Sequence, residues 1–198
     1  MSCHESRASR GQPHTEEQIR ATRLVELKPL VGRIVLADYD PAWPRLFERE
    51  AQRVRAALGD RALSIDHVGS TAVPGLVAKP IIDMVLAVAD SADEPAYVPS
   101  MEAAGYVLCI RDPDDHEQRL FNGPDTNINL HVHSHGCSEI SRMLAFRDRL
   151  RASEADRERY ASAKRGLAAK DWKYTQNYAD AKTEVIAEIL KRTSASPP

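Results

Sequence analysis

Residues 67–83 read His-Val-Gly-Ser-Thr-Ala-Val-Pro-Gly-Leu-Val-Ala-Lys-Pro-Ile-Ile-Asp. The segment before this stretch, 62–68, has a strand-like pattern and ends in Gly69-Ser70. The segment after it, 80–88, is a continuous apolar run that only Asp83 interrupts. Such a run is typical of a central strand that is covered on both faces. We therefore expect two neighbouring strands whose connection places Ser70 and Asp83 side by side.

The segments on either side complete a pattern of strands followed by helices. We expect further strands at 32–38, 106–110, 117–121 and 127–133, a helix from Pro41 to Gly59, and a short helix before Gly105. From Ser138 onward the apolar spacing is helical, Ser138 and Ser153 are suitable N-caps, and the last helix spans 180–190. The sequence predicts an α+β fold with a mixed sheet in 32–133 and a C-terminal helical cap in 138–192.

Composition limits the classes of protein that need to be considered. The chain has 198 residues, of which 42% are hydrophobic and 28% charged, enough for one ordinary domain, expected at 24–192. Polar residues 1–23 are expected to form a flexible tail, although Thr15 and Gln18 have capping-box spacing, and 193–198 a frayed end. The formal net charge of -2 argues against nucleic acid as the main partner.

Cysteine usage and hydropathy indicate the compartment. The three cysteines, Cys3, Cys109 and Cys137, are odd in number and form no Cys-x-x-Cys pair, which favours a reducing environment. The chain shows no apolar signal segment and no apolar stretch long enough to cross a bilayer. We expect a cytoplasmic protein without a membrane partner.

Asp83 is the most informative single residue. A carboxylate inside an apolar strand is costly unless it is paired or holds a cation. One interpretation is therefore a metal ligand, and the other is a salt bridge from Lys79 or Arg119.

The Gly69-Ser70 turn is a candidate phosphate site. A strand that ends in Gly-Ser can present backbone N–H groups and a hydroxyl to a phosphate, although an isolated Gly-Ser is more often an ordinary tight turn. The combination with Asp83, and with Lys79 as a countercharge, favours phosphate binding.

The strand at 127–133 places Asn129, His131 and His133 on one face by alternation. Two histidines at i and i+2 have the spacing of metal ligands, and the alternative is a solvated polar face. Most basic residues of the C-terminal half are expected on a solvated face, since acids are interleaved with them. A polyanionic ligand nevertheless needs more positive charge than Lys79 provides, so at least one of four residues is expected to face the site: Arg147, Arg151, Lys164 and Lys182.

From about Val35 to Leu190 the chain resembles the GrpB family of the nucleotidyltransferase-like superfamily. The resemblance rests on Asp38-Tyr39-Asp40-Pro41-Ala42-Trp43-Pro44, on 67–83, on Leu144-Ala145-Phe146-Arg147-Asp148 with Leu150-Arg151, and on Tyr178 with Lys182.

The resemblance implies a nucleotidyltransferase-like core, in which Gly-Ser holds nucleotide phosphates and acids on the next strand bind divalent metal. Active members of the superfamily carry Asp-x-Asp on that strand, whereas the second acid position here is Val85. Asp66 or His131 is a candidate for the missing ligand. His131 fits the His-Leu-His-Val of the family, but Asn129 replaces its first histidine. Some GrpB-type domains are fused to a coenzyme A biosynthetic kinase, which implies a link to coenzyme A metabolism.

The function expected from these features is Mg²⁺- or Mn²⁺-dependent transfer of a nucleotidyl group from a nucleoside triphosphate to a small acceptor. Asp83 and His131 are the candidate catalytic residues. The candidate metal ligands are Asp83, Asp66, His131 and His133. The candidate phosphate-binding residues are His67, Gly69, Ser70, Thr71, Lys79, Arg119, Arg147, Arg151, Lys164 and Lys182. Two alternatives stay open: a non-catalytic nucleotide-binding accessory module, and a metal-dependent hydrolase built on Asp83, His131 and His133.

Overall fold

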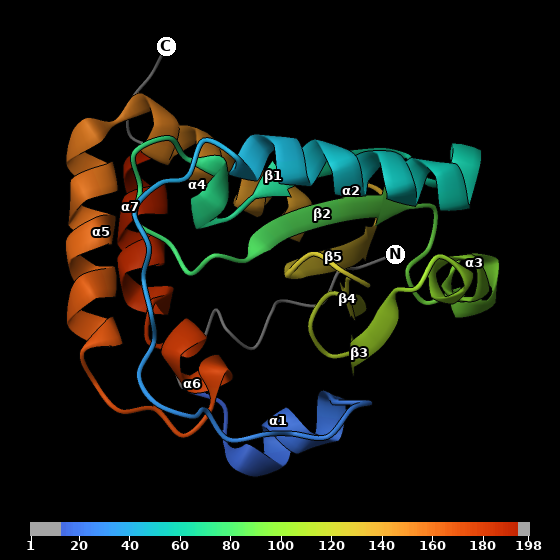
Figure 1. The fold of residues 1–198 in the computed structure, drawn as a ribbon, viewed down its shortest axis with the longest axis horizontal. Coiled ribbons are helices and arrows are strands. Elements are labelled where there is room, and N and C mark those ends of the chain that lie inside the picture. Colours follow the sequence, from blue (N-terminus) through green and yellow to red (C-terminus); the bar gives the residue numbers. More distant parts are fainter. Residues whose placement is uncertain (1–12, 194–198) are drawn as a thin grey trace.

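A mixed five-stranded sheet forms the centre of the structure, a computed structural model that describes residues 13–193 (Figure 1). Its strands are β1 (Ser64–Val68), β2 (Ile82–Val88), β3 (Val107–Asp112), β4 (Gln118–Asn122) and β5 (Ile128–Ser134). The order is β1-β2-β5-β4-β3, with β2 and β5 parallel and the other neighbours antiparallel. The expected α+β fold is confirmed, and in the described residues every strand lies before Ser138.

One face of the sheet packs on two helices, α2 (Trp43–Leu58) and α3 (Val98–Ala103). Alternation along β2 and β5 directs Met84, Leu86, Leu130 and Val132 toward this face, where they form the main core with apolar residues of α2. As predicted, the intervening residues of β5, Asn129, His131 and His133, lie on the opposite face. The sheet thus has an apolar face under α2 and a polar face directed toward the rest of the molecule.

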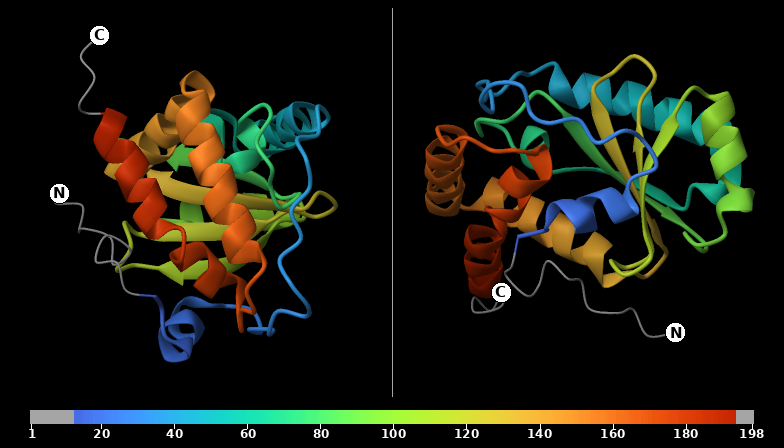
Figure 2. Two further views of the ribbon diagram at one scale, coloured as in Figure 1. Left: turned by 90° about the vertical axis from the view of Figure 1, so that its left-hand side faces the viewer. Right: turned by 90° about the horizontal axis from the view of Figure 1, so that it is seen from below.

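The C-terminal helices stand together beside the end of β1 and the start of β2 (Figures 1 and 2). They are α4 (Ser138–Ala152), α5 (Glu154–Ala168), α6 (Thr175–Asp180) and α7 (Thr183–Thr193). A second core joins them to the loop between β1 and β2 through Val73, Leu76, Leu150 and Ile189. Ser153 caps α5 as expected, whereas Cys137, not Ser138, occupies the N-cap of α4. The helical cap therefore packs directly on the loop that follows Gly69-Ser70.

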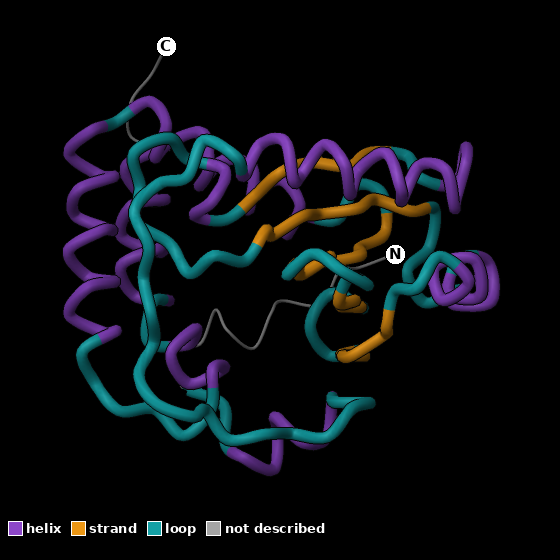
Figure 3. Tube along the Cα trace, in the orientation of Figure 1, coloured by secondary structure: helices purple, strands orange, loops and turns teal. Residues whose placement is uncertain are grey.

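The strand expected at 32–38 is wrong. This segment belongs to a long connector (residues 24–42), drawn as loop beside α5 in Figure 3, in which Ala37 alone pairs in a bridge with Ala78. Its apolar side chains explain the path: Ile34 packs on Ala168 and Tyr178, while Val35 is 73% exposed. The alternation of this segment reflects packing on helices instead of pairing in the sheet.

Of the expected flexible tail at 1–23, the structure describes residues 13–23, which include a helix, and residues 1–12 lie outside the described part. Helix α1 (Glu16–Thr22) begins with the Thr15–Gln18 capping box. His14 contacts Asp180 through its backbone N–H at 2.8 Å and its ring at 3.0 Å. These contacts fix the segment to α6. Of the end at 193–198, the structure describes only Thr193, in α7.

No helix in the described residues is both long enough and apolar enough to span a membrane.

Candidate functional site

The turn after β1 lies directly against Asp83. The register pairs Val68 with Asp83, and the chain then turns at Gly69, whose φ is +67°. A Cβ atom at Gly69 would lie 2.5 Å from Asp83 Oδ2, closer than any non-bonded contact allows. Glycine is therefore required here both for its positive φ and for this close approach. Ser70 begins a short 3-10 turn, Ser70–Ala72, beside the carboxylate.

Asp83 belongs to a row of hydrogen-bonded side chains that crosses the sheet. Asn129 Nδ2 donates to Asp83 Oδ1 at 2.9 Å, Asn122 Nδ2 donates to Asn129 Oδ1 at 3.4 Å, and Cys109 Sγ donates to Asn122 Oδ1 at 2.9 Å. Neither expected salt bridge is present: Asp83 lies on the polar face of the sheet with Asn129 as its partner. It keeps partial exposure to solvent.

Three lysines lie within electrostatic range of this carboxylate; we call Lys79, Lys164 and Lys182 the lysine cluster. The negative charge of Asp83 acts on all three ammonium groups, yet burial dominates and lowers the pKa of each, that of Lys164 to about 7 and that of Lys182 to about 8. Lys164 is 2% exposed, whereas Lys79 and Lys182 reach the surface in part. Among the described residues none of the three has an ion-pair partner; Lys164 donates to the carbonyl of Val77.

Two tyrosines hold the lysine cluster in place. The Tyr178 ring lies 5.6 Å from Lys79 Nζ and 4.7 Å from Lys182 Nζ, so both cations share one aromatic ring. The Tyr160 ring lies 5.3 Å from Lys164 Nζ, and its side chain lies close to Ser70. The Tyr178 hydroxyl is buried without a hydrogen-bond partner in the described residues. The site thus combines three cations, one anion and neutral hydroxyl groups.

The C-terminal arginines expected near the site contact the turn backbone. Arg147 Nη1 donates to the carbonyl of His67 at 3.0 Å, and Arg151 Nε donates to the carbonyl of Ala72 at 2.9 Å. Since these residues are one helical turn apart on α4, that helix holds both ends of the Gly69-Ser70 turn. Lys164 and Lys182, the other two of these four basic residues, belong to the lysine cluster.

His67 and Thr71 contact each other, away from the Asp83 face. Alternation along β1 places His67 toward α2, where its ring stacks on Phe47 with centroids 4.8 Å apart. Its Nε2 lies 3.0 Å from the Thr71 hydroxyl, and burial lowers its pKa to about 4. A neutral, stacked imidazole supports the turn from behind and offers no charge to a phosphate.

Arg119 was expected to bind phosphate, but it lies on the other face of the sheet. It is 4% exposed and lies on the α2 face of the sheet, where it bonds Glu94 and Glu117. The register pairs it with Val132, whose side chain faces the core. The alternation with Phe121, two residues further along β4, is the sequence signal that indicates this face.

The expected metal ligands do not converge. Asp66 Oδ1 lies 3.6 Å from Arg147 Nη1, and His133 is fully buried with both ring nitrogens unpartnered in the described chain. No group of three or more His, Cys, Asp or Glu side chains in residues 13–193 is placed to hold a metal ion. Asp83 already accepts a hydrogen bond from the Asn129 amide. These residues do not fit a two-metal centre.

Tyr160 and the acceptor role of Asp83 toward Asn129 were not predicted from the sequence. The four-residue spacing of Tyr178 and Lys182 was an available signal for their contact, because it suits neighbours on a helical turn. Tyr160 offered none, since it contacts Ser70 across 90 residues of chain.

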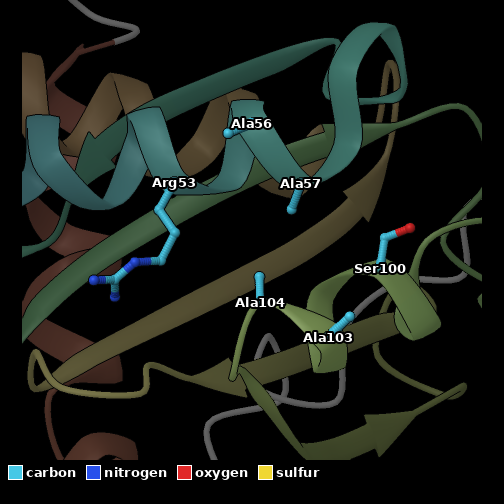
Figure 4. A pocket seen from close by; sticks show the side chains of 6 residues that line it. All are labelled: Arg53, Ala56, Ala57, Ser100, Ala103 and Ala104. Atoms are coloured by element: carbon cyan, nitrogen blue, oxygen red, sulfur yellow. The ribbon is translucent and has the colours of Figure 1, made fainter.

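A groove elsewhere on the surface has few polar side chains. It lies between α2 and α3, encloses about 500 Å³, and is lined mainly by alanines, with Arg53 and Ser100 (Figure 4). Alanine methyl groups offer neither hydrogen bonds nor charge, so the site candidate stays at the Gly69-Ser70 turn.

Comparisons with known proteins place the chain in a family. The family described as "GrpB protein" matches residues 33–192. A UPF0157 protein of Halalkalibacterium halodurans is 56% identical over 189 residues, covering 96% of this chain and 97% of that protein. The crystal structure of GrpB from Enterococcus faecalis superposes with a TM-score of 0.69 at 32% identity, covering 80% of this chain and 98% of that one. A dephospho-CoA kinase of Mycobacterium bovis is 32% identical over 157 residues, 65% of this chain and 38% of that protein. The chain belongs to the GrpB family.

Proposed function

We propose that this protein binds the phosphate groups of a nucleotide between the Gly69-Ser70 turn and the lysine cluster, and that it works as a nucleotide-binding module. The main support is the lysine cluster: the charge of Asp83 acts on all three ammonium groups, Lys79 and Lys182 share the Tyr178 ring, and none of the three has an ion pair in the described residues. Buried cations are costly unless an anion compensates them, and one carboxylate cannot compensate three. A phosphate ligand supplies the missing negative charge. Lysine is a common phosphate-binding residue in other proteins.

A module without nucleotidyl transfer agrees better with the acids that are present. Two-metal transfer requires carboxylates that bridge both ions. Here Val85 occupies the next site-facing position of β2, and the β5 residue paired with Asp83 is Asn129, which is not an acid. The partial match to a protein named dephospho-CoA kinase supports the expected link to coenzyme A metabolism. A metal-dependent hydrolase has less support, because His133 is fully buried.

The proposal is tested by calorimetric titration of ATP, ADP and AMP into the wild type and into Lys164→Met and Lys182→Met. A charge-assisted hydrogen bond contributes about 1.5–3 kcal/mol, so each variant should bind roughly tenfold weaker or worse. Lys191→Met is the matched control, because Lys191 is an exposed lysine on α7 and should leave the affinity unchanged.

Two outcomes would contradict the proposal. If both variants bind nucleotides as tightly as the wild type, per folded molecule, the phosphate groups lie elsewhere. If the wild type releases pyrophosphate from a nucleoside triphosphate with Mg²⁺ or Mn²⁺, and Asp83→Asn stops this release, the protein is a transferase and not a module.

A further inference from the structure

The charges around the Gly69-Ser70 turn do not balance without a ligand. Asp83 acts on all three ammonium groups of the lysine cluster and offsets one of them. Other charged groups that reach the lysines have partners of their own: Asp180 with His14, and Arg165 with Glu158. With every lysine protonated, the site carries an excess of two positive charges.

This excess matches one particular phosphate chemistry. A terminal phosphate monoester carries close to two negative charges at neutral pH, whereas an internal phosphodiester carries one. Burial makes the match important, since an uncompensated charge in a low-dielectric site costs far more than one in water. The uncharged groups of the site, the Ser70 hydroxyl and the Tyr178 ring, do not change this balance.

Asp83 acts on the lysines without a direct ion pair, and both of its carboxylate oxygens face protein groups. Its Oδ1 accepts from Asn129, and its Oδ2 faces the Gly69 turn so closely that a Cβ atom there would lie 2.5 Å away. The lysines already supply the positive charge that a divalent ion would bring to a phosphate.

We propose that the site is a metal-independent receptor for a dianionic terminal phosphate monoester, with the lysine cluster as its counter-ions and Asp83 as the acid that limits its charge. This inference rests on the proposed function, since it specifies the ligand class of the same site.

The test uses two nucleotides that share a base and sugar. AMP, a monoester, and 3′,5′-cyclic AMP, a diester, are titrated into the wild-type protein in EDTA and again with excess Mg²⁺. We expect AMP to bind in EDTA with an affinity that Mg²⁺ does not increase, and cyclic AMP to bind at least tenfold more weakly. Inorganic phosphate, which lacks base and sugar, should compete with AMP.

Asp83→Asn gives a result of opposite sign under the two interpretations. If the lysines alone hold the phosphate, removal of the neighbouring negative charge should tighten AMP binding, by about tenfold for a charge a few ångströms away. If Asp83 holds a metal, the same variant should abolish binding. The wild-type titrations keep the proposal testable even if this variant folds poorly.

Three outcomes would overturn this inference while leaving nucleotide binding intact: AMP binding only with Mg²⁺ or Mn²⁺, loss of AMP binding in folded Asp83→Asn, or equal affinity for AMP and cyclic AMP. By contrast, if AMP, ADP and ATP all fail to bind with and without metal, the proposed function itself is wrong.

Discussion

At the scale of single residues, Gly69 carries the closest contact of the site. Any side chain at this position would be destabilised in two ways. The backbone has a positive φ, and a Cβ atom would lie 2.5 Å from Asp83 Oδ2. Gly75 provides a matched comparison in the same loop, since its φ is +77° and nothing lies within 4 Å of its Cβ position. The difference between the two glycines therefore isolates the contact with Asp83.

We predict that Gly75→Ala lowers the free energy of unfolding by about 1 kcal/mol, the usual cost of a positive φ. Gly69→Ala should cost roughly 2–3 kcal/mol or more, because the methyl group also displaces the Asp83 carboxylate. Urea denaturation of both variants measures the difference. Equal losses for the two variants would show that the turn does not press on Asp83.

At the scale of elements, α4 fixes the Gly69-Ser70 turn through two carbonyl contacts. Arg147 and Arg151 donate to the carbonyls of His67 and Ala72, which flank the turn. We predict that Arg147→Gln and Arg151→Gln raise amide hydrogen exchange in peptides covering 66–76 and leave β5 unchanged. Arg165→Gln is the control, because Arg165 is exposed and pairs with Glu158 on α5.

Unchanged exchange at 66–76 in both arginine variants would mean that the loop keeps its shape by core packing alone, through Val73 and Leu76. In that case α4 would have no positioning role at the site.

Periodicity predicts most elements because it reports which face is buried. Apolar spacing alone identifies the central strand β2 and the helix α2, and both lie within two residues of the expected bounds. The same spacing gives a wrong prediction at 32–38, because Ile34 packs on the C-terminal helices and the segment does not pair as a strand of the sheet. The prediction for Arg119 is wrong for another reason. Its charge suggested a phosphate contact, but its register with Val132 directs the side chain toward Glu94.

At the scale of the whole molecule, the site is assembled from distant segments. The Gly69-Ser70 turn and Asp83 are predictable as neighbours because they end and begin adjacent strands. Lys164 and Lys182 join them only through the packing of α5 and of the α6–α7 junction on the loop between β1 and β2. No local pattern in the sequence links these lysines to Lys79. The sequence argument could say only that a polyanionic ligand needs more positive charge than Lys79 provides.

Two buried histidines predict how the stability of the molecule depends on pH. Burial lowers the pKa of His67 and His133 to about 4, below the usual 6.5. Between these values the unfolded chain binds protons that the folded chain does not, so stability is fully present above about pH 6.5 and is lost as the pH falls toward 4. Each histidine should contribute up to about 3 kcal/mol to this loss.

Urea denaturation from about pH 7 to about pH 4 checks this prediction. His133→Leu should flatten the pH dependence, because leucine does not titrate and the buried ring leaves no hydrogen-bond partner unpaired among the described residues. His135→Ala, at an exposed position, should leave the curve unchanged. A curve for His133→Leu as steep as that of the wild type would contradict the assignment.

The location of a bound phosphate tests the central claim most directly. A crystal structure of the protein with AMP, grown in EDTA, should show the phosphate between the Ser70 hydroxyl and the ammonium groups of Lys79, Lys164 and Lys182, with no metal ion on Asp83. A phosphate bound away from these lysines would contradict the account. So would AMP that binds only in crystals grown with Mg²⁺, with its phosphate joined to Asp83 through the divalent ion.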